Sequence, residues 1–142
     1  MLDRIERVLD LRHPPEKVWA ALTTAEGLGG WLGTHAEIDE LRPGGRARVR
    51  WGPGEEDTLC FQVVEPPRLF AYTWSIEGLP PDDPRRTYVE FTLEPTGTGT
   101  RLTVVETGFA QLPDEFTDAY ESHPEGWRVK LPELAEYLDA AA

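Results

Sequence analysis

Residues 126–138 decide the fold of this chain: Gly126-Trp127-Arg128-Val129-Lys130-Leu131-Pro132-Glu133-Leu134-Ala135-Glu136-Tyr137-Leu138. Trp127, Leu131, Leu134 and Leu138 recur in it at helical spacing, and charged residues fall on the other faces. This pattern predicts an amphipathic helix with one continuous apolar stripe. Because Pro132 removes an internal hydrogen bond, we expect either a kink there or packing firm enough to tolerate it.

A shorter helical segment lies near the start of the chain. Before it, residues 4–12 alternate between two sets of positions with an interruption at Val8, which predicts a half-buried strand. Pro14 and Pro15 end that strand, and a proline just before Glu16 favours the start of a helix. We expect two short, loosely joined helices before residue 34.

Between the helical segments, hydrophobic residues recur with period two and Pro or Gly separates the runs. The predicted strands are residues 35–41, 46–51, 58–64, 68–75, 86–94 and 101–107. Alternation places one set of large side chains on a common inward face: Val49, Trp51, Leu59, Phe61, Val63, Phe70, Tyr72, Trp74, Val89, Phe91, Leu93, Leu102 and Val104. We therefore predict an α+β fold, with a curved antiparallel sheet of six to seven strands wrapped on the long C-terminal helix.

Length and charge limit the function classes. The 142 residues fit one domain spanning 1–142. Fourteen Lys and Arg against 26 Asp and Glu give a net charge of −12, which repels phosphates and anionic headgroups over roughly 8 Å at physiological salt. We expect no nucleic-acid partner and no membrane insertion. The basic stretch Arg46–Arg50 alternates with Ala and Val, which favours a solvated strand face over an anion site.

The cysteine content and the N-terminus favour the cytoplasm. Cys60 is the single cysteine in the sequence, so an internal disulfide is excluded and a reducing compartment is favoured. The first seven residues are charged where a signal peptide needs an apolar core, and no apolar run approaches about 18 residues. The oligomeric state is left open.

The inward aromatic residues have two interpretations. They either fill the space between sheet and helix as core, or leave part of it open for an apolar small molecule with one or two polar anchors. In the second case Trp31 lies at the entrance, aromatic residues of the strands and the last helix form the walls, and Tyr72 and Tyr120 can donate hydrogen bonds to the ligand. The full set is Trp31, Trp51, Phe61, Tyr72, Trp74, Phe91, Glu106, Tyr120, Trp127 and Leu131.

Catalytic and metal-binding patterns are mostly missing from the sequence. His13, His35 and His123 are scattered, so we predict no metal and no cofactor. Neither a nucleophile elbow nor a phosphate-binding glycine loop is present. Glu106 shares strand parity with inward residues, and a glutamate facing an aromatic cavity can act as a general acid or base. Pairing with Arg48 or Arg101 is the alternative.

Seven segments in order resemble single-domain relatives of the activator of Hsp90 ATPase homologue 1-like family, within the START and Bet v 1-like helix-grip superfamily. They are Arg12–Thr23, Trp31–Gly33, Arg42–Gly45, Val64–Leu69 with Tyr72–Trp74, Val89–Pro95, Gly97–Thr103 and Gly126–Trp127. The resemblance implies a strand, two short helices, further antiparallel strands and a long C-terminal helix across the concave face. Superfamily members include lipid carriers, hormone receptors, polyketide cyclases and co-chaperone domains, so function transfers less directly than fold.

Three hypotheses follow. The first is a cytoplasmic, noncatalytic domain that binds a small hydrophobic ligand between sheet and helix. The second is a protein-interaction or stress-related module with an Hsp90-type chaperone as partner. The eukaryotic co-chaperone contacts its chaperone largely through a separate N-terminal domain, for which the 142 residues here leave no room, so this partner stays the alternative. The third is a polyketide cyclase or hydrolase that uses Glu106.

Overall fold

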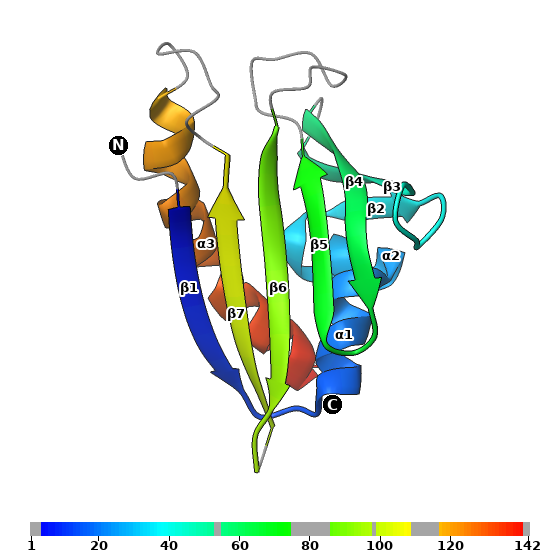
Figure 1. Cartoon of the computed structure of the whole chain (residues 1–142), viewed down its shortest axis with the longest axis vertical. Helices are drawn as coiled ribbons and strands as arrows, with labels where there is room; N and C mark the ends of the chain where they lie inside the picture. Colours follow the sequence, from blue (N-terminus) through cyan, green and yellow to red (C-terminus); the bar gives the residue numbers. More distant parts are fainter. Residues whose placement is uncertain (1–3, 53–54, 75–85, 98, 109–116, 141–142) are drawn as a thin grey trace.

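Seven antiparallel strands form one sheet in the computed structural model, in the order β1-β7-β6-β5-β4-β3-β2 (Figure 1). The strands are β1 (Arg4–Leu11), β2 (His35–Ile38), β3 (Arg46–Gly52), β4 (Glu55–Glu65), β5 (Leu69–Trp74), β6 (Thr87–Pro95) and β7 (Thr100–Thr107). The helices are α1 (Pro15–Thr23), α2 (Ala25–Gly27), the π-helical turn η1 (Leu28–Leu32) and α3 (Thr117–Ala140). The predicted α+β fold is confirmed.

The structure describes residues 4–52, 55–74, 86–97, 99–108 and 117–140. For residues 51, 52, 55 and 117–126 it describes the backbone alone. No helix in these ranges is long and apolar enough to cross a membrane.

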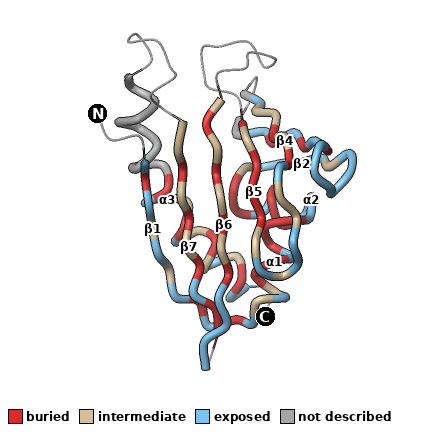
Figure 2. Tube along the Cα trace, viewed as in Figure 1, coloured by how far each residue is buried: buried red, intermediate tan, exposed pale blue. Residues whose placement is uncertain are grey.

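Inward and outward residues alternate along the central strands as predicted, and buried positions recur along them in Figure 2. β6 and β7 follow this alternation without interruption over most of their length. β4 departs from it, because its pairing with β5 shifts between Phe61 and Val63. Phe61 lies opposite Tyr72, but Val64 lies opposite Phe70 and packs against the core.

The prediction that Val63 faces inward is therefore wrong. A β-bulge inserts one extra residue into a strand, and each residue beyond it changes face. Val64 takes the inward position that strict alternation gives to Val63.

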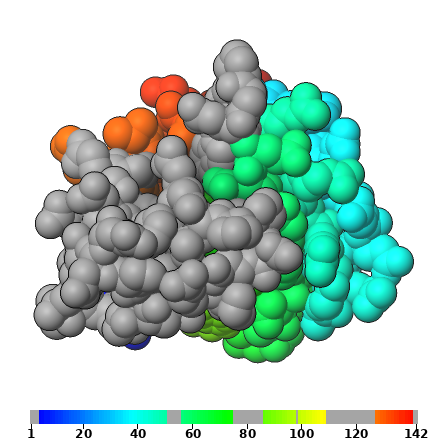
Figure 3. Space-filling model, turned by 90° about the horizontal axis from the view of Figure 1, so that it is seen from above, coloured from blue at the N-terminus to red at the C-terminus, as the bar shows by residue number. Residues whose placement is uncertain are grey.

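All the helices lie on one face of the sheet (Figure 1). The predicted apolar stripe of α3 is confirmed, because Trp127, Leu131, Leu134 and Leu138 are all buried in the core. The helix begins at Thr117, well before Gly126, and stays helical through Pro132. Seen from above, α3 and the strands β2 to β4 occupy different sides of the molecule (Figure 3).

A polar clasp joins the start of α1 to the last turn of α3. Lys17 Nζ donates to the Leu138 carbonyl at 3.0 Å and lies 3.2 Å from His13 Nδ1. Since an ammonium can only donate, Nδ1 accepts and the proton sits on Nε2, which donates to Asp139 Oδ1 at 2.7 Å. The clasp ties residues that are far apart in sequence and fixes one end of the helix that covers the sheet.

Candidate functional site

Three aromatic side chains of β5 form the centre of the interior. Phe70, Tyr72 and Trp74 sit at alternate positions, so all three point to the face that the helices cover. The Tyr72 ring centre lies 5.4 Å from that of Trp74, in an edge-to-face arrangement, and 5.7 Å from that of Phe70. Edge-to-face and tilted contacts at these distances are the arrangements that aromatic pairs prefer.

Trp127 of α3 completes the aromatic wall from the opposite side. Its indole stacks on that of Trp74 with ring centres 5.6 Å apart and planes 18° from parallel. The same ring meets Phe91 of β6 edge-on at 5.9 Å. Trp74 lies on the inward strand face that alternation predicts and Trp127 on the apolar helix stripe that helical spacing predicts, and the two meet in the interior.

Glu106 lies within these rings and is fully buried. Its Oε1 accepts a hydrogen bond from Trp127 Nε1 at 2.9 Å. Its Oε2 accepts from Trp74 Nε1 at 2.9 Å and from the Thr87 hydroxyl at 2.6 Å. Trp74 Nε1 also points to Thr87 Oγ1 at 2.8 Å, so sheet and helix meet in one polar cluster.

The inward position of Glu106 is the one that strand parity predicts. The alternative partners weighed from sequence are engaged elsewhere, because Arg48 pairs with Glu37 and Arg101 with Asp10. Burying a carboxylate costs several kcal/mol unless donors replace its water, and the two indoles and the hydroxyl supply three.

The Tyr72 hydroxyl is the one buried side-chain polar atom in the described ranges that has no hydrogen-bond partner. Burial raises the pKa of Tyr72 well above its ordinary value, and the negative charges of Glu106 and Asp57 raise it further. The phenol is therefore neutral at physiological pH and able to donate a proton in a hydrogen bond.

The other predicted ligand-binding residues fall into three groups. Phe61 and Phe91 are fully buried, and Leu131 belongs to the same core. Trp31 is also buried in the core, where its indole donates to the Ala21 carbonyl at 2.8 Å and braces η1 against α1. The side chains of Trp51 and Tyr120 lie outside the described part of the structure.

Sequence reasoning missed Thr87. Its parity with Val89 and Phe91 on β6 is a signal that places it inward, beside Trp74 across the strand pair. Threonine is common in strands for packing reasons, so the residue type alone does not mark a polar cluster.

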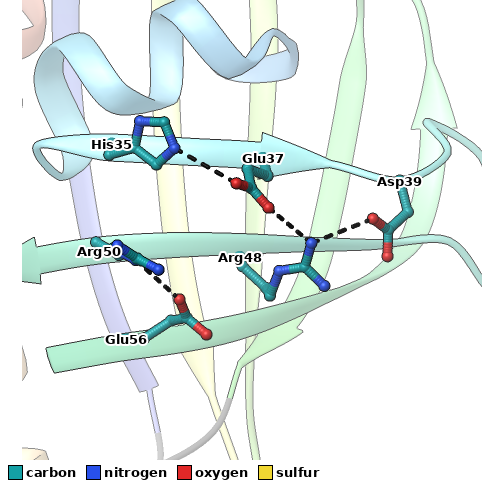
Figure 4. Close-up of polar contacts among 6 residues, drawn as sticks. All are labelled: His35, Glu37, Asp39, Arg48, Arg50 and Glu56. Atoms are coloured by element: carbon teal, nitrogen blue, oxygen red, sulfur yellow. Dashed lines mark hydrogen bonds and ion pairs between the residues drawn. The ribbon is translucent and has the colours of Figure 1, made fainter. Parts of the chain in front are cut away.

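Charged residues on the exposed side of β2, β3 and β4 pair with one another (Figure 4). Arg48 donates to Glu37 at 2.7 Å and lies 3.7 Å from Asp39, while Arg50 lies 3.2 Å from Glu56. The hydrogen bond from Arg48 lowers the pKa of Glu37. Because carboxylates neutralise these two guanidinium groups, the stretch is the solvated strand face that alternation predicts.

The donor set at the buried cluster does not suit a metal ion. One carboxylate and one hydroxyl meet two indole N–H groups, which donate hydrogen bonds and do not ligate. Within the described ranges, no three His, Cys, Asp or Glu side chains converge on one point. The cluster is a buried hydrogen-bond network in which donors from β5, β6 and α3 meet one carboxylate.

Comparisons with known proteins extend over nearly the entire chain. A family model described as "Activator of Hsp90 ATPase homolog 1-like protein" matches residues 12–139. Protein MLL2253 from Mesorhizobium loti, known from a crystal structure, shares 29% sequence identity with this chain. The two structures align with a TM-score of 0.82 over 98% of each chain. No functionally curated protein matches the sequence.

Two further solved structures share the fold at lower identity. The Aha1 dimer from Colwellia psychrerythraea is 21% identical, with a TM-score of 0.75 over 97% of this chain and 96% of the other. CalU16 from Micromonospora echinospora is 23% identical, with a TM-score of 0.68 over 95% of this chain and 74% of the other.

Proposed function

The chain belongs to the Activator of Hsp90 ATPase homolog 1-like protein family, and from this premise we propose that it binds a small, largely apolar ligand between the sheet and α3. The ligand would lie against Trp74 and Trp127, with polar contact near Glu106. The lone cysteine fits action in a reducing compartment such as the cytoplasm.

One observation carries the proposal: a fully buried carboxylate sits among aromatic rings where apolar residues would stabilise the fold as well or better. The cluster links β5, β6, β7 and α3 through indole and hydroxyl donors. An aromatic interior with a few convergent polar groups is the usual composition of a small-molecule site.

Tryptophan fluorescence tests the proposal, because two indoles line the suggested site. The purified protein is titrated with a long-chain alcohol, a flavonoid and an aromatic polyketide, with N-acetyltryptophanamide correcting for absorption by the ligand. We expect a saturable change with at least one of the three compounds.

A pair of variants locates the signal. Trp19→Phe removes an indole that contacts Phe70, away from the polar cluster, and should keep the saturable change. Trp127→Phe removes the indole stacked on Trp74 and should lose most of it. A flat response from the unmodified protein across the whole panel would sink ligand binding as its function.

Contact with an Hsp90-type chaperone is a second candidate, supported by the description of the family. In this case the partner would meet the outer surface and not the buried cluster. Adding the protein to a bacterial Hsp90 should then raise its rate of ATP hydrolysis and give a complex on size exclusion. An unchanged rate with no complex would remove this candidate.

A further inference from the structure

The hydroxyl of Tyr72 has an unmet bonding capacity in the middle of the interior. Its residue is fully buried, its oxygen is closed off from solvent, and no described group bonds to it. Nearly all buried polar groups in folded proteins have a partner, so an exception calls for an explanation. Phenylalanine would fill the same place without the unmet hydrogen bond.

The surroundings define what kind of atom could meet this hydroxyl. Aromatic rings of Phe70, Trp74 and Phe91 lie with their centres 5.4 to 6.0 Å from the Tyr72 ring. A ligand atom that reaches the hydroxyl must therefore pass among aromatic rings, which favours a flat, apolar ligand body. Because the phenol is protonated, the complementary ligand atom is an acceptor, such as a carbonyl or ether oxygen.

The charge of the ligand is limited by Glu106. Trp74, the ring that packs edge-to-face on Tyr72, donates to the Glu106 carboxylate, so an acidic group already shares this interior. The raised pKa of Tyr72 has the same origin, since burial and the charges of Glu106 and Asp57 disfavour a second negative charge there. A ligand carboxylate would meet the same repulsion.

We propose that the Tyr72 hydroxyl is the anchor that selects uncharged aromatic ligands carrying a hydrogen-bond acceptor, and that the nearby Glu106 carboxylate discriminates against ligands with a carboxylate. The inference rests on the proposed ligand-binding function and names the ligand class for it. Because solvent does not reach the hydroxyl in the free protein, a ligand reaches it only when neighbouring side chains move.

Three naphthalenes of similar size test the proposal by equilibrium dialysis at neutral pH. 2-Acetylnaphthalene carries a neutral acceptor, 2-isopropylnaphthalene replaces it with carbon, and 2-naphthoate carries a charge. Each is measured against the unmodified protein, Tyr72→Phe and the control Tyr88→Phe. Tyr88 lies on the neighbouring strand, is less buried, and its hydroxyl bonds Glu90 at 3.2 Å.

We expect Tyr72→Phe to weaken binding of 2-acetylnaphthalene by about tenfold and to leave 2-isopropylnaphthalene unchanged. Tyr88→Phe should change neither. The unmodified protein should bind 2-naphthoate at least about tenfold more weakly than the ketone. Without ligand, Tyr72→Phe should melt about 2–4 °C higher, because it removes an unpaired hydroxyl.

The outcomes separate the two proposals. Equal binding of the ketone to the unmodified protein and Tyr72→Phe overturns the anchor and leaves ligand binding intact. Binding of none of the three compounds, together with a flat fluorescence panel, overturns both. A lower melting temperature for ligand-free Tyr72→Phe also overturns the anchor, because the hydroxyl would then already be bonded in the free protein.

Discussion

At the residue scale, Glu106 is the buried group whose charge is most costly to remove from water. Its two oxygens face donors that come from β5, β6 and α3, and the Trp74 Nε1 proton is shared between Glu106 and the Thr87 hydroxyl. An ionised carboxylate only accepts hydrogen bonds, so the cluster is matched to that form.

Replacing Glu106 by Gln should destabilise the fold in spite of the equal size. The amide NH₂ must face either Trp127 Nε1–H or the Trp74 and Thr87 side, and at least one donor then meets a donor. We expect a loss of about 1–3 kcal/mol in the free energy of unfolding, measured by urea denaturation. Glu94→Gln, on the exposed end of β6, should change it by less than about 0.5 kcal/mol. Equal effects of the two substitutions would contradict the described geometry.

Tyr72 should make stability depend on pH in the alkaline range. Its pKa is raised in the folded state, whereas the unfolded phenol ionises near 10.0. Above that pH the unfolded chain binds fewer protons than the folded one, so the stabilising contribution present below pH 10 is lost as pH rises. In urea melts, the unmodified protein should lose about 1 kcal/mol more than Tyr72→Phe between pH 10 and pH 11. Parallel pH profiles would show that the phenol ionises freely in the folded protein.

At the element scale, α3 is held by its apolar stripe and by the clasp at its last turn. The clasp joins His13 and Lys17 to Asp139 and the Leu138 carbonyl. A basic group that donates to a carbonyl in the last helical turn also compensates the partial negative charge there. The clasp therefore stabilises the end of the helix without adding to its buried apolar area.

Loss of the clasp should loosen the last turn of α3 before it affects the sheet. His13→Ala removes the imidazole that links Lys17 to Asp139, at an expected cost of about 1–2 kcal/mol. Hydrogen exchange should then speed up at the amides of residues 136–140 and stay unchanged in β6. His35→Ala, at an exposed position of β2, should leave exchange in α3 as it is. Equal protection in both variants would mean that packing alone holds the helix end.

The bulge in β4 can be tested with a neighbouring pair of residues. Val64 packs against the core, whereas Val63 lies opposite Ala71 on the other face. Val64→Asp should therefore cost more than about 2 kcal/mol, because it brings a charge to the core, and Val63→Asp should cost clearly less. Urea denaturation of the two variants measures the difference. The reverse order of stability would place the register shift elsewhere.

These elements also show where sequence reasoning succeeds and where it ends. Period-two alternation places Trp74 and Glu106 on the inward face correctly because no bulge interrupts β5 or β7 at these residues. A bulge has no characteristic residue composition here. The sequence therefore does not predict that Val64, and not Val63, faces the core. The bond between His13 and Asp139 depends on how helix ends meet in space, and spacing along the chain carries no information about that.

At the scale of the whole molecule, the net negative charge destabilises the fold, whereas the surface ion pairs stabilise it. The chain carries a net charge of −12, and this excess repels itself in the folded state. The ion pairs beside β2, β3 and β4 act in the other direction, but their groups are exposed and such pairs contribute little each (Figure 4).

Salt should therefore stabilise this protein. Raising NaCl from 10 mM to 150 mM shortens the screening length from about 30 Å to about 8 Å, which weakens long-range repulsion more than contacts at 3 Å. We expect the urea midpoint at pH 7.5 to rise with salt. Near pH 4.6, where the net charge approaches zero, the same step should have little effect. A midpoint that falls with salt at pH 7.5 would mean that the paired charges on the outer face outweigh the repulsion of the whole surface.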